Sequence, residues 1–257
     1  MLGLVTIGQT PRPDFEAAFK EYVPGVEFRI VGALDGLEPG EIDDLSAQPG
    51  DYPLHMLLAD GSTADIQLET LQPIVKQTML NLVSDGASAI GLLCTGRFPE
   101  FEVGVPVLEP GKLLPAVAGA IATSGRVGVV TPIESQREIV REIWESDGFS
   151  PTVAVSSPYH EGQIEAAAKV MAEAKPELVV LDCMGLGPDH RDEFTRLSGC
   201  PTLTAQTLLA KVAGEVAGTD SPKRDIVMPR SCANLPGGLA WRSTRHVDED
   251  DAFQNEV

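Results

Sequence analysis

The sequence predicts an α/β protein built from two similar halves, each with a parallel sheet, and an active cleft between the halves. Strand-like and helix-like patterns alternate along the 257 residues, which is typical of a parallel sheet with helices on its faces. The pattern also restarts, because residues 126–132 (RVGVVTP) repeat the glycine, apolar pair and threonine of residues 2–8 (LGLVTIG). Finally, Cys94 and Cys183 each end an apolar run and open a glycine turn.

The strands and helices of the first half are predicted from local sequence patterns. A short apolar strand over 2–7 leads into a proline-rich turn, whose prolines and Asp14 favour a helix over 15–22. A second strand is expected over 26–31. Residues 52–66 alternate around Asp60-Gly61, which indicates a hairpin. The elements expected next are a helix over 68–84, a strand ending at Cys94, a short strand over 105–108 and an alanine-rich helix over 112–123.

The second half repeats this alternation of strands and helices. After the strand at 126–132 we expect a helix over 134–145, a strand over 152–155, a helix over 164–174, the strand before Cys183, a helix over 189–197, a short strand at 202–203 and a final helix over 204–217. The predicted division is 1–110 for the first half, joined by the 204–217 helix, and 111–203 for the second. Residues 218–257 have prolines, a glycine pair and an acidic run without a sustained period, which predicts a flexible tail.

The two strand-end cysteines are the strongest functional signal. Ligands of open α/β sheets bind beyond the carboxyl ends of the strands, so both thiols are expected to face one cleft. A thiolate is a base and a thiol is an acid, so a facing pair suits proton transfer at carbon. The alternative is that each cysteine is a small buried hydrophobe. Cys200 and Cys232 lack such a setting, and we expect structural roles for them.

Composition excludes several classes. The formal net charge of −19 repels nucleic acid and anionic membranes. The chain has neither an apolar run of about eighteen residues nor a signal-peptide pattern, so we expect a cytoplasmic protein without membrane association. The four cysteines form no disulfide framework or metal motif, the histidines are scattered, and no glycine-rich phosphate loop is present, so we expect no metal and no cofactor.

Polar residues near the predicted strand ends complete the candidate site. Arginines after the first and Cys94 turns can pair with a carboxylate, and threonines and main-chain amides can donate hydrogen bonds to it. His160 and His190 are further acid-base or binding candidates, although a loop or helix-start position explains each of them better. The predicted substrate-binding residues are Thr6, Gly8, Gln9, Thr10, Arg12, Thr95, Gly96, Arg97, Thr131, Met184 and Gly185.

Three strings of this sequence resemble the AroM family, which is related to the aspartate/glutamate racemase superfamily: residues 6–12 (TIGQTPR), 94–96 (CTG) and 182–185 (DCMG). The resemblance covers about residues 1–217. It implies two halves around a pseudo-twofold axis, catalysis by cysteines at positions 94 and 183 without a cofactor, and a dimer or larger assembly. Racemases commonly have Cys-Thr at the second position, whereas this chain has Cys183-Met184, which lacks the hydroxyl donor.

Together these features predict a racemase or isomerase of a small carboxylic acid, with Cys94 and Cys183 as the acid-base pair. One alternative is a cysteine-dependent decarboxylase or cis–trans isomerase acting on a small diacid. Another is a protein that binds a small acid without turning it over. The sequence itself does not identify the substrate.

Overall fold

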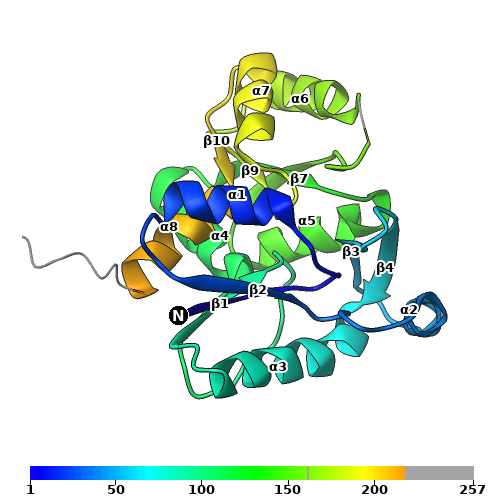
Figure 1. Ribbon diagram of the computed structural model, residues 1–257. Helices are drawn as coiled ribbons and strands as arrows, with labels where there is room; N and C mark the ends of the chain where they lie inside the picture. The colour runs from blue at the N-terminus through cyan, green and yellow to red at the C-terminus, as the bar shows by residue number, and fades with distance from the viewer. Residues whose placement is uncertain (161, 218–257) are drawn as a thin grey trace, which may run out of the picture. The chain divides into compact units, whose positions relative to one another are not determined.

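The computed structural model describes residues 1–160 and 162–217, and these form two parallel sheets with helices on their faces (Figure 1). The first sheet has the strand order β2-β1-β5-β6 and the second has β8-β7-β9-β10. Both therefore have the same topology, with β1 corresponding to β7 and β5 to β9. This confirms the predicted fold class. The predicted tail at 218–257, with Cys232, lies outside the described residues.

The first half contains six strands and four helices. Their bounds are β1 Leu2–Thr6, α1 Pro13–Tyr22, β2 Phe28–Gly32, α2 Pro39–Ser46, β3 Pro53–Leu57, β4 Thr63–Gln67, α3 Leu68–Ser84, β5 Ala89–Leu93, β6 Val107–Leu108 and α4 Pro110–Ile121. Strands β3 and β4 pair antiparallel, as the Asp60-Gly61 turn predicts. Helix α2 was not predicted. It begins with a capping box between Glu38 and Glu41, and it buries only Ile42.

The second half has four strands, a 3₁₀ turn and four α-helices. They are β7 Arg126–Thr131, the turn Glu134–Gln136, α5 Arg137–Ser146, β8 Ser150–Val155, α6 Gln163–Ala174, β9 Leu178–Leu181, α7 Pro188–Ser198, β10 Thr202–Thr204 and α8 Ala205–Ala217. Helix α8 contacts α1 and β5 of the first half and α4 at the junction between the halves. No helix in the described part of the chain is long and apolar enough to cross a membrane.

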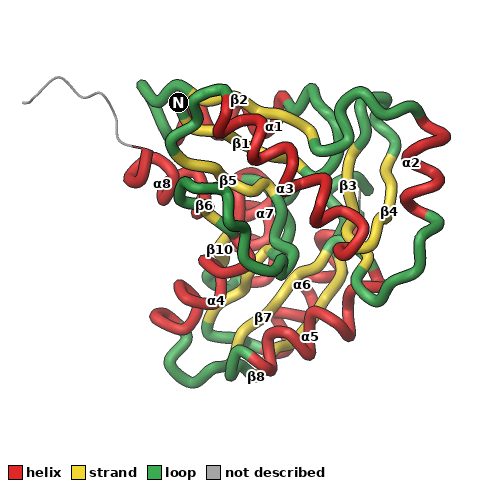
Figure 2. The backbone as a smooth tube through the Cα atoms, turned by 90° about the horizontal axis from the view of Figure 1, so that it is seen from below, coloured by secondary structure: helices red, strands yellow, loops and turns green. Residues whose placement is uncertain are grey.

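Three buried clusters form the core, and one of them joins the two halves. One extends across both halves and includes Phe15, Phe19 and Trp144, all at most 1% exposed. The other two lie between one sheet and its outer helices, α3 on the first sheet and α6 with α7 on the second (Figures 1 and 2). Burial of each large apolar side chain contributes roughly 1.5–3 kcal/mol. The shared cluster therefore keeps the carboxyl ends of β1, β5, β7 and β9 in a defined arrangement.

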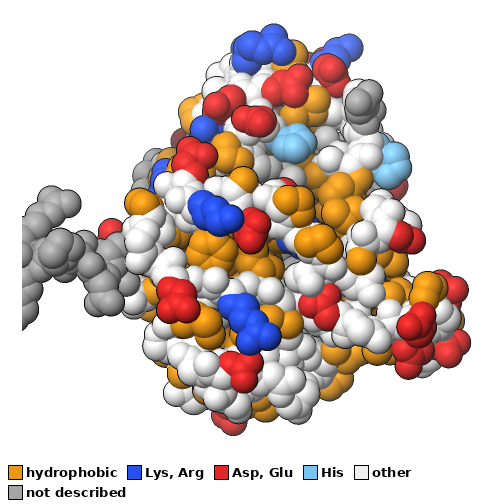
Figure 3. Space-filling view, in the orientation of Figure 1, with side chains coloured by type: hydrophobic (Ala, Val, Ile, Leu, Met, Phe, Trp, Pro, Cys, Tyr) orange, Lys and Arg blue, Asp and Glu red, His pale blue; other side chains and the backbone are white. Residues whose placement is uncertain are grey.

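The charged side chains of the described surface are unevenly distributed. Figure 3 shows charges of both signs scattered over one face, with acidic groups gathered over α2. The helix α2 contributes Glu41, Asp43 and Asp44 to that group. This distribution agrees with the net charge of −19.

Candidate active site

Cys94 and Cys183 line the same cavity. Cys94 follows the last residue of β5, and Cys183 lies two residues beyond β9, the corresponding strand of the second sheet. The cavity has a volume of about 40 Å³ and is also lined by residues of the first turn, the β3–β4 hairpin and the segment after β7. The equal topology of the two sheets therefore brings both thiols to one cavity.

The turn after β5 holds Cys94 and connects the halves. The Gly96 amide donates a hydrogen bond to Cys94 Sγ over 3.3 Å. The Thr95 hydroxyl donates to the Asp182 carbonyl oxygen over 3.1 Å, so the two cysteine-bearing segments are bonded directly to each other. The Thr95 hydroxyl proton is thereby engaged within the protein.

Both thiols are predominantly neutral near pH 7. Burial raises the pKa of Cys94 to about 12, and the nearby Cys183 and Asp182 add to the rise. Burial also raises the pKa of Cys183, to about 11; Asp182 adds to it, while the Gly185 amide and Arg12 favour the thiolate. Arg12 and the Gly185 amide therefore favour ionisation of Cys183, which is also the less buried thiol of the pair.

Asp182 directly precedes Cys183, and its charge raises the pKa of both thiols. Its Oδ2 accepts a hydrogen bond from Trp144 Nε1 over 2.9 Å. Burial raises the pKa of Asp182, and the Trp144 bond and the charge of Arg97 oppose that rise. A protonated Asp182 leaves both thiols easier to ionise, because the like charge is removed.

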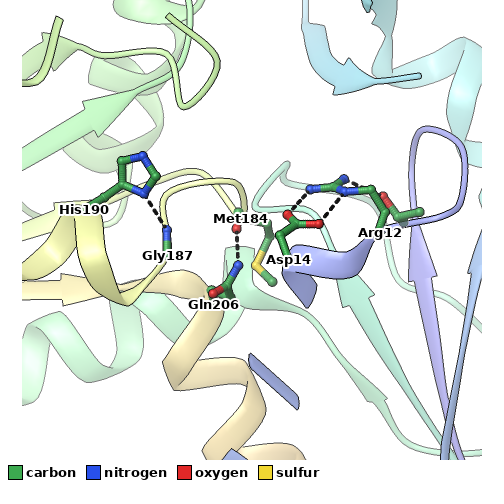
Figure 4. A network of polar contacts seen from close by, with 7 residues as sticks. Arg12, Asp14, Met184, Gly187, His190 and Gln206 are labelled. Carbon is green, nitrogen blue, oxygen red and sulfur yellow. Dashed lines mark hydrogen bonds and ion pairs between the residues drawn. The ribbon is translucent and has the colours of Figure 1, made fainter. Parts of the chain in front are cut away.

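Arg12 brings a buried cation to the cavity. Its Nε and Nη2 donate to both carboxylate oxygens of Asp14, over 2.9 and 2.6 Å, and Nη1 donates to the Thr6 hydroxyl over 3.3 Å (Figure 4). Its guanidinium carbon lies 3.8 Å from the centroid of the Phe15 ring. Arginine has five N–H donors, so two remain for a ligand. The Thr6 hydroxyl accepts from Arg12, which leaves its own proton to donate.

The segment after Cys183 is fixed by α7 and α8. Gln206 Nε2 donates to the Met184 carbonyl oxygen over 3.1 Å, and the Gly187 amide donates to His190 Nδ1 over 3.3 Å (Figure 4). Gly185 is a glycine because of close packing: a Cβ there would lie 2.7 Å from Pro158 Cγ. Met184 and Gly185 thus offer main-chain groups for hydrogen bonds at the position where racemases commonly have a threonine hydroxyl.

The structure brings nine of the thirteen predicted catalytic and binding residues into this cavity: Thr6, Arg12, Cys94, Thr95, Gly96, Thr131, Cys183, Met184 and Gly185. Thr131 donates its hydroxyl proton to Gln136 Oε1 over 2.7 Å, and Gln136 Nε2 donates to the Pro53 carbonyl oxygen over 2.7 Å. Gln136 thus connects β7 of one half to the hairpin of the other.

 The four predicted residues that do not line the cavity are Gly8, Gln9, Thr10 and Arg97.

These four residues have other contacts. Gly8 packs under the hairpin, where a Cβ would collide with the Leu57 carbonyl oxygen. Gln9 Nε2 donates to the Leu34 and Leu37 carbonyl oxygens, and its Oε1 accepts from the Ala59 amide.

Thr10 and Arg97 bind carboxylates of the protein itself. The Thr10 amide and hydroxyl both donate to Asp35, over 2.7 and 2.9 Å. Arg97 Nη2 pairs with Asp147 over 2.7 Å and lies above the Trp144 ring. Thr10 therefore orders the first turn, and Arg97 joins the two halves beside the cavity.

Sequence reasoning missed four polar residues of the cavity: Tyr52, His55, Gln136 and Tyr159. None follows a parallel strand that carries a cysteine, so the strand-end argument did not point to them. Burial raises the pKa values of Tyr52 and Tyr159 far above the ordinary phenol range, which keeps both as neutral hydroxyl groups. The predicted candidates His160 and His190 line a neighbouring pocket instead.

Cys200 is buried away from the cavity, where its sulfur lies 3.6 Å from the Met171 carbonyl oxygen. Within residues 1–160 and 162–217, no group of three or more histidine, cysteine, aspartate or glutamate side chains is arranged to hold a metal ion.

Two sheets of equal topology, with their strand-end cysteines on one cavity, place the protein in the aspartate/glutamate racemase fold class. Arylmalonate decarboxylase is 15% identical, with 84% of this chain and 92% of that chain covered and a TM-score of 0.56. Allantoin racemase from Klebsiella pneumoniae is 13% identical, with 84% and 87% covered and a TM-score of 0.54. Glutamate racemase from Aquifex pyrophilus is 13% identical, with 84% and 83% covered and a TM-score of 0.51. At such identities the likeness establishes the fold alone.

A family model described as AroM protein matches residues 2–217, and the chain therefore belongs to the AroM family. No curated protein matches this chain.

Proposed function

We propose that the protein is a cofactor-independent racemase or isomerase of a small carboxylic acid, with Cys94 and Cys183 as its acid and base. The observation that carries the proposal is that both cysteines, from corresponding strands of the two sheets, line one cavity. A carbon held between two thiols can lose a proton to one and gain a proton from the other, which inverts its configuration.

The difference between the thiols assigns their roles. Cys183 is the less buried thiol and the Arg12 cation favours its thiolate, so we assign Cys183 as the base. The Cys183 thiolate takes the proton as the C–H bond breaks, and the electron pair moves into the conjugated carboxylate. The Cys94 thiol then delivers its proton to the opposite face and becomes the thiolate. Because burial keeps both pKa values high, either thiolate is a strong base for a carbon acid.

The intermediate carries extra negative charge, and the cavity offers donors for it. Arg12 has two N–H groups beyond those bound to Asp14 and Thr6, and the Thr6 hydroxyl has a proton to donate. The neutral phenols of Tyr52 and Tyr159 line the same space. Donors fixed in advance by a buried network stabilise developing charge without reorganisation. The hydroxyls of Thr95 and Thr131 donate their protons to other groups of the protein, so these residues position the segments that line the cavity.

Exchange of a carbon-bound proton with solvent tests this proposal. The panel consists of small carboxylic acids: phenylmalonate, maleate and the separate enantiomers of glutamate and aspartate. Each is incubated with the protein in D₂O and followed by ¹H NMR. We expect at least one acid to take up deuterium, and Cys94→Ala/Cys183→Ala to remove that uptake.

The alternatives give different outcomes in the same experiment. Release of carbon dioxide from phenylmalonate identifies decarboxylation, and conversion of maleate to fumarate identifies cis–trans isomerisation. Ligand-induced NMR shifts without uptake, release or conversion identify a binding protein. Any of these results in place of exchange contradicts the racemase proposal.

A further inference from the structure

His55 is a buried histidine of the cavity with one ring nitrogen unused. It lies on β3 directly opposite Asp65 on β4, and its side chain is 7% exposed. Its Nδ1 lies 2.6 Å from Asp65 Oδ1. Its Nε2 is buried and has no hydrogen-bond partner among the described residues. An unpaired buried nitrogen is costly, so this one indicates a ligand.

The contact with Asp65 orients the ring. A carboxylate accepts hydrogen bonds, so Nδ1 carries a proton and donates it to Asp65. The Nε2 edge remains for a ligand, and a ring that carries a proton on both nitrogens donates there to a carboxylate. The tilted Tyr159 ring, whose centroid is 5.7 Å away, restricts the ring on another side.

An outer pocket of about 420 Å³ adjoins the inner cavity at His55. The two spaces share His55 and Pro132, and the outer one extends to Arg137, His160 and Gln163. The inner cavity, at about 40 Å³, has room for only a few atoms. A substrate larger than a reacting carbon and its carboxylate must therefore extend beyond the inner cavity, and the outer pocket beside His55 offers space for it.

The outer pocket is rich in hydrogen-bond donors. The Gln163 Oε1 accepts from the Ser157 amide over 2.8 Å, which leaves its NH₂ group for other contacts. His160 Nδ1 lies 3.0 Å from the Ser157 hydroxyl, so its Nε2 edge is the outward one. The acidic side chain of this pocket, Glu134, already pairs with Arg137 through both oxygens. The pocket therefore suits an acceptor group, and a carboxylate most of all.

We propose that this outer pocket is a second ligand subsite, in which His55, His160 and Gln163 bind a carboxylate at the far end of the substrate. The proposal rests on the proposed function, because it places the reacting end between the cysteines. It narrows the substrate class to acids with a second carboxylate several bonds from the reacting carbon. His55 is then the residue that distinguishes a diacid from a monoacid.

Binding of two matched acids tests the subsite. Glutarate and pentanoate have the same chain length and differ by one carboxylate, and their dissociation constants are measured by NMR titration of the full-length protein. We expect glutarate to bind at least about tenfold more tightly, as one charge-assisted hydrogen bond provides. In His55→Gln this preference falls to about twofold or less, since Gln cannot provide the charged donor.

Two further variants make the result decisive. His190→Gln removes a histidine that lines neither space and should keep the preference, whereas His160→Gln, at the outer end, should reduce it without altering the β3–β4 hairpin. Equal binding of the two acids by the wild type, or an unchanged preference in both His55→Gln and His160→Gln, overturns the proposal. The titration needs no turnover, so it separates failure of the subsite from failure of the proton-transfer chemistry, which deuterium uptake reports.

Discussion

The turn after β5 and the turn after β9 occupy equivalent places in the two sheets but surround their thiols differently. In the first, Cys94 is 8% exposed and accepts a hydrogen bond from Gly96, and Thr95 binds across to the other turn. In the second, Cys183 follows the buried acid Asp182 and lies near Arg12, whose charge favours its thiolate. Duplication therefore supplies the positions of the pair, and unlike neighbours supply the difference between acid and base.

Replacing Arg12 should have the largest effect on the difference between Cys94 and Cys183. In the wild type, Cys183 should react with iodoacetamide at lower pH than Cys94, because its thiolate forms first. Arg12→Gln removes the cation and should reduce the Cys183 thiolate fraction at pH 9 about tenfold or more, with little change at Cys94. Peptide mass spectrometry of samples alkylated at a series of pH values measures both sites.

Arg12→Lys is the matched control, because it keeps the charge and loses the fork that binds Asp14. The order of reaction, Cys183 before Cys94, should survive in this variant. If Arg12→Gln leaves the order and rate at Cys183 unchanged, the cation does not create the asymmetry.

A smaller effect concerns the hairpin, which has no counterpart in the second half. Gln136→Ala leaves the Thr131 hydroxyl and the Pro53 carbonyl without their partners, which should lower the free energy of unfolding by about 1–3 kcal/mol. Urea unfolding measures this loss. Gln48→Ala, which removes an exposed glutamine bonded to the Asp44 carbonyl oxygen, should change stability by less than about 0.5 kcal/mol. Equal effects of the two substitutions would show that Gln136 does not connect the halves energetically.

Asp182 should give the smallest change, visible as a dependence on pH. Burial raises its pKa above the ordinary 3.8, so the folded state holds the proton more tightly than the unfolded state. Its contribution to stability is then favourable at low pH and declines as pH rises from the unfolded pKa toward the folded one. Asp182→Asn keeps an acceptor for Trp144 and removes the titration.

The free energy of unfolding of Asp182→Asn, relative to that of the wild type, should therefore increase as pH rises. Urea unfolding from pH 4 to pH 8 measures the difference at each pH. A difference that stays constant across this range, or shrinks toward pH 8, contradicts the assigned direction of the pKa shift.

Local pattern was enough to predict most of the fold and the two thiols. The apolar runs before Cys94 and Cys183 are strands of equivalent position, and the Asp60-Gly61 hairpin forms as expected. Helix boundaries shifted where proline begins a helix: α1 begins at Pro13 and α4 at Pro110, two residues before the expected starts. Helix α2 was missed because its glycine, proline and acidic residues bury a single apolar side chain, Ile42.

The rest of the site depends on contacts between distant segments. His55 and Tyr52 reach the cavity because the hairpin folds over the first sheet's strand ends, and no local pattern specifies that placement. Gln9 and Thr10 sit at the right sheet edge, but carbonyl and carboxylate partners in the 34–37 loop hold them there. Position along a strand therefore predicted which turns meet, while the partners of each side chain decided which residues face the cavity.

Isotope exchange in the two single cysteine variants tests the central claim most directly. With the pure enantiomers of whichever panel acid exchanges, Cys94→Ser and Cys183→Ser should each lose interconversion by about a hundredfold or more, because a hydroxyl is a poor acid and base at neutral pH. Each variant should keep deuterium uptake into one enantiomer only, and the two should prefer opposite enantiomers. Near-wild-type interconversion in either variant would contradict the two-thiol account and leave the cysteines as packing residues.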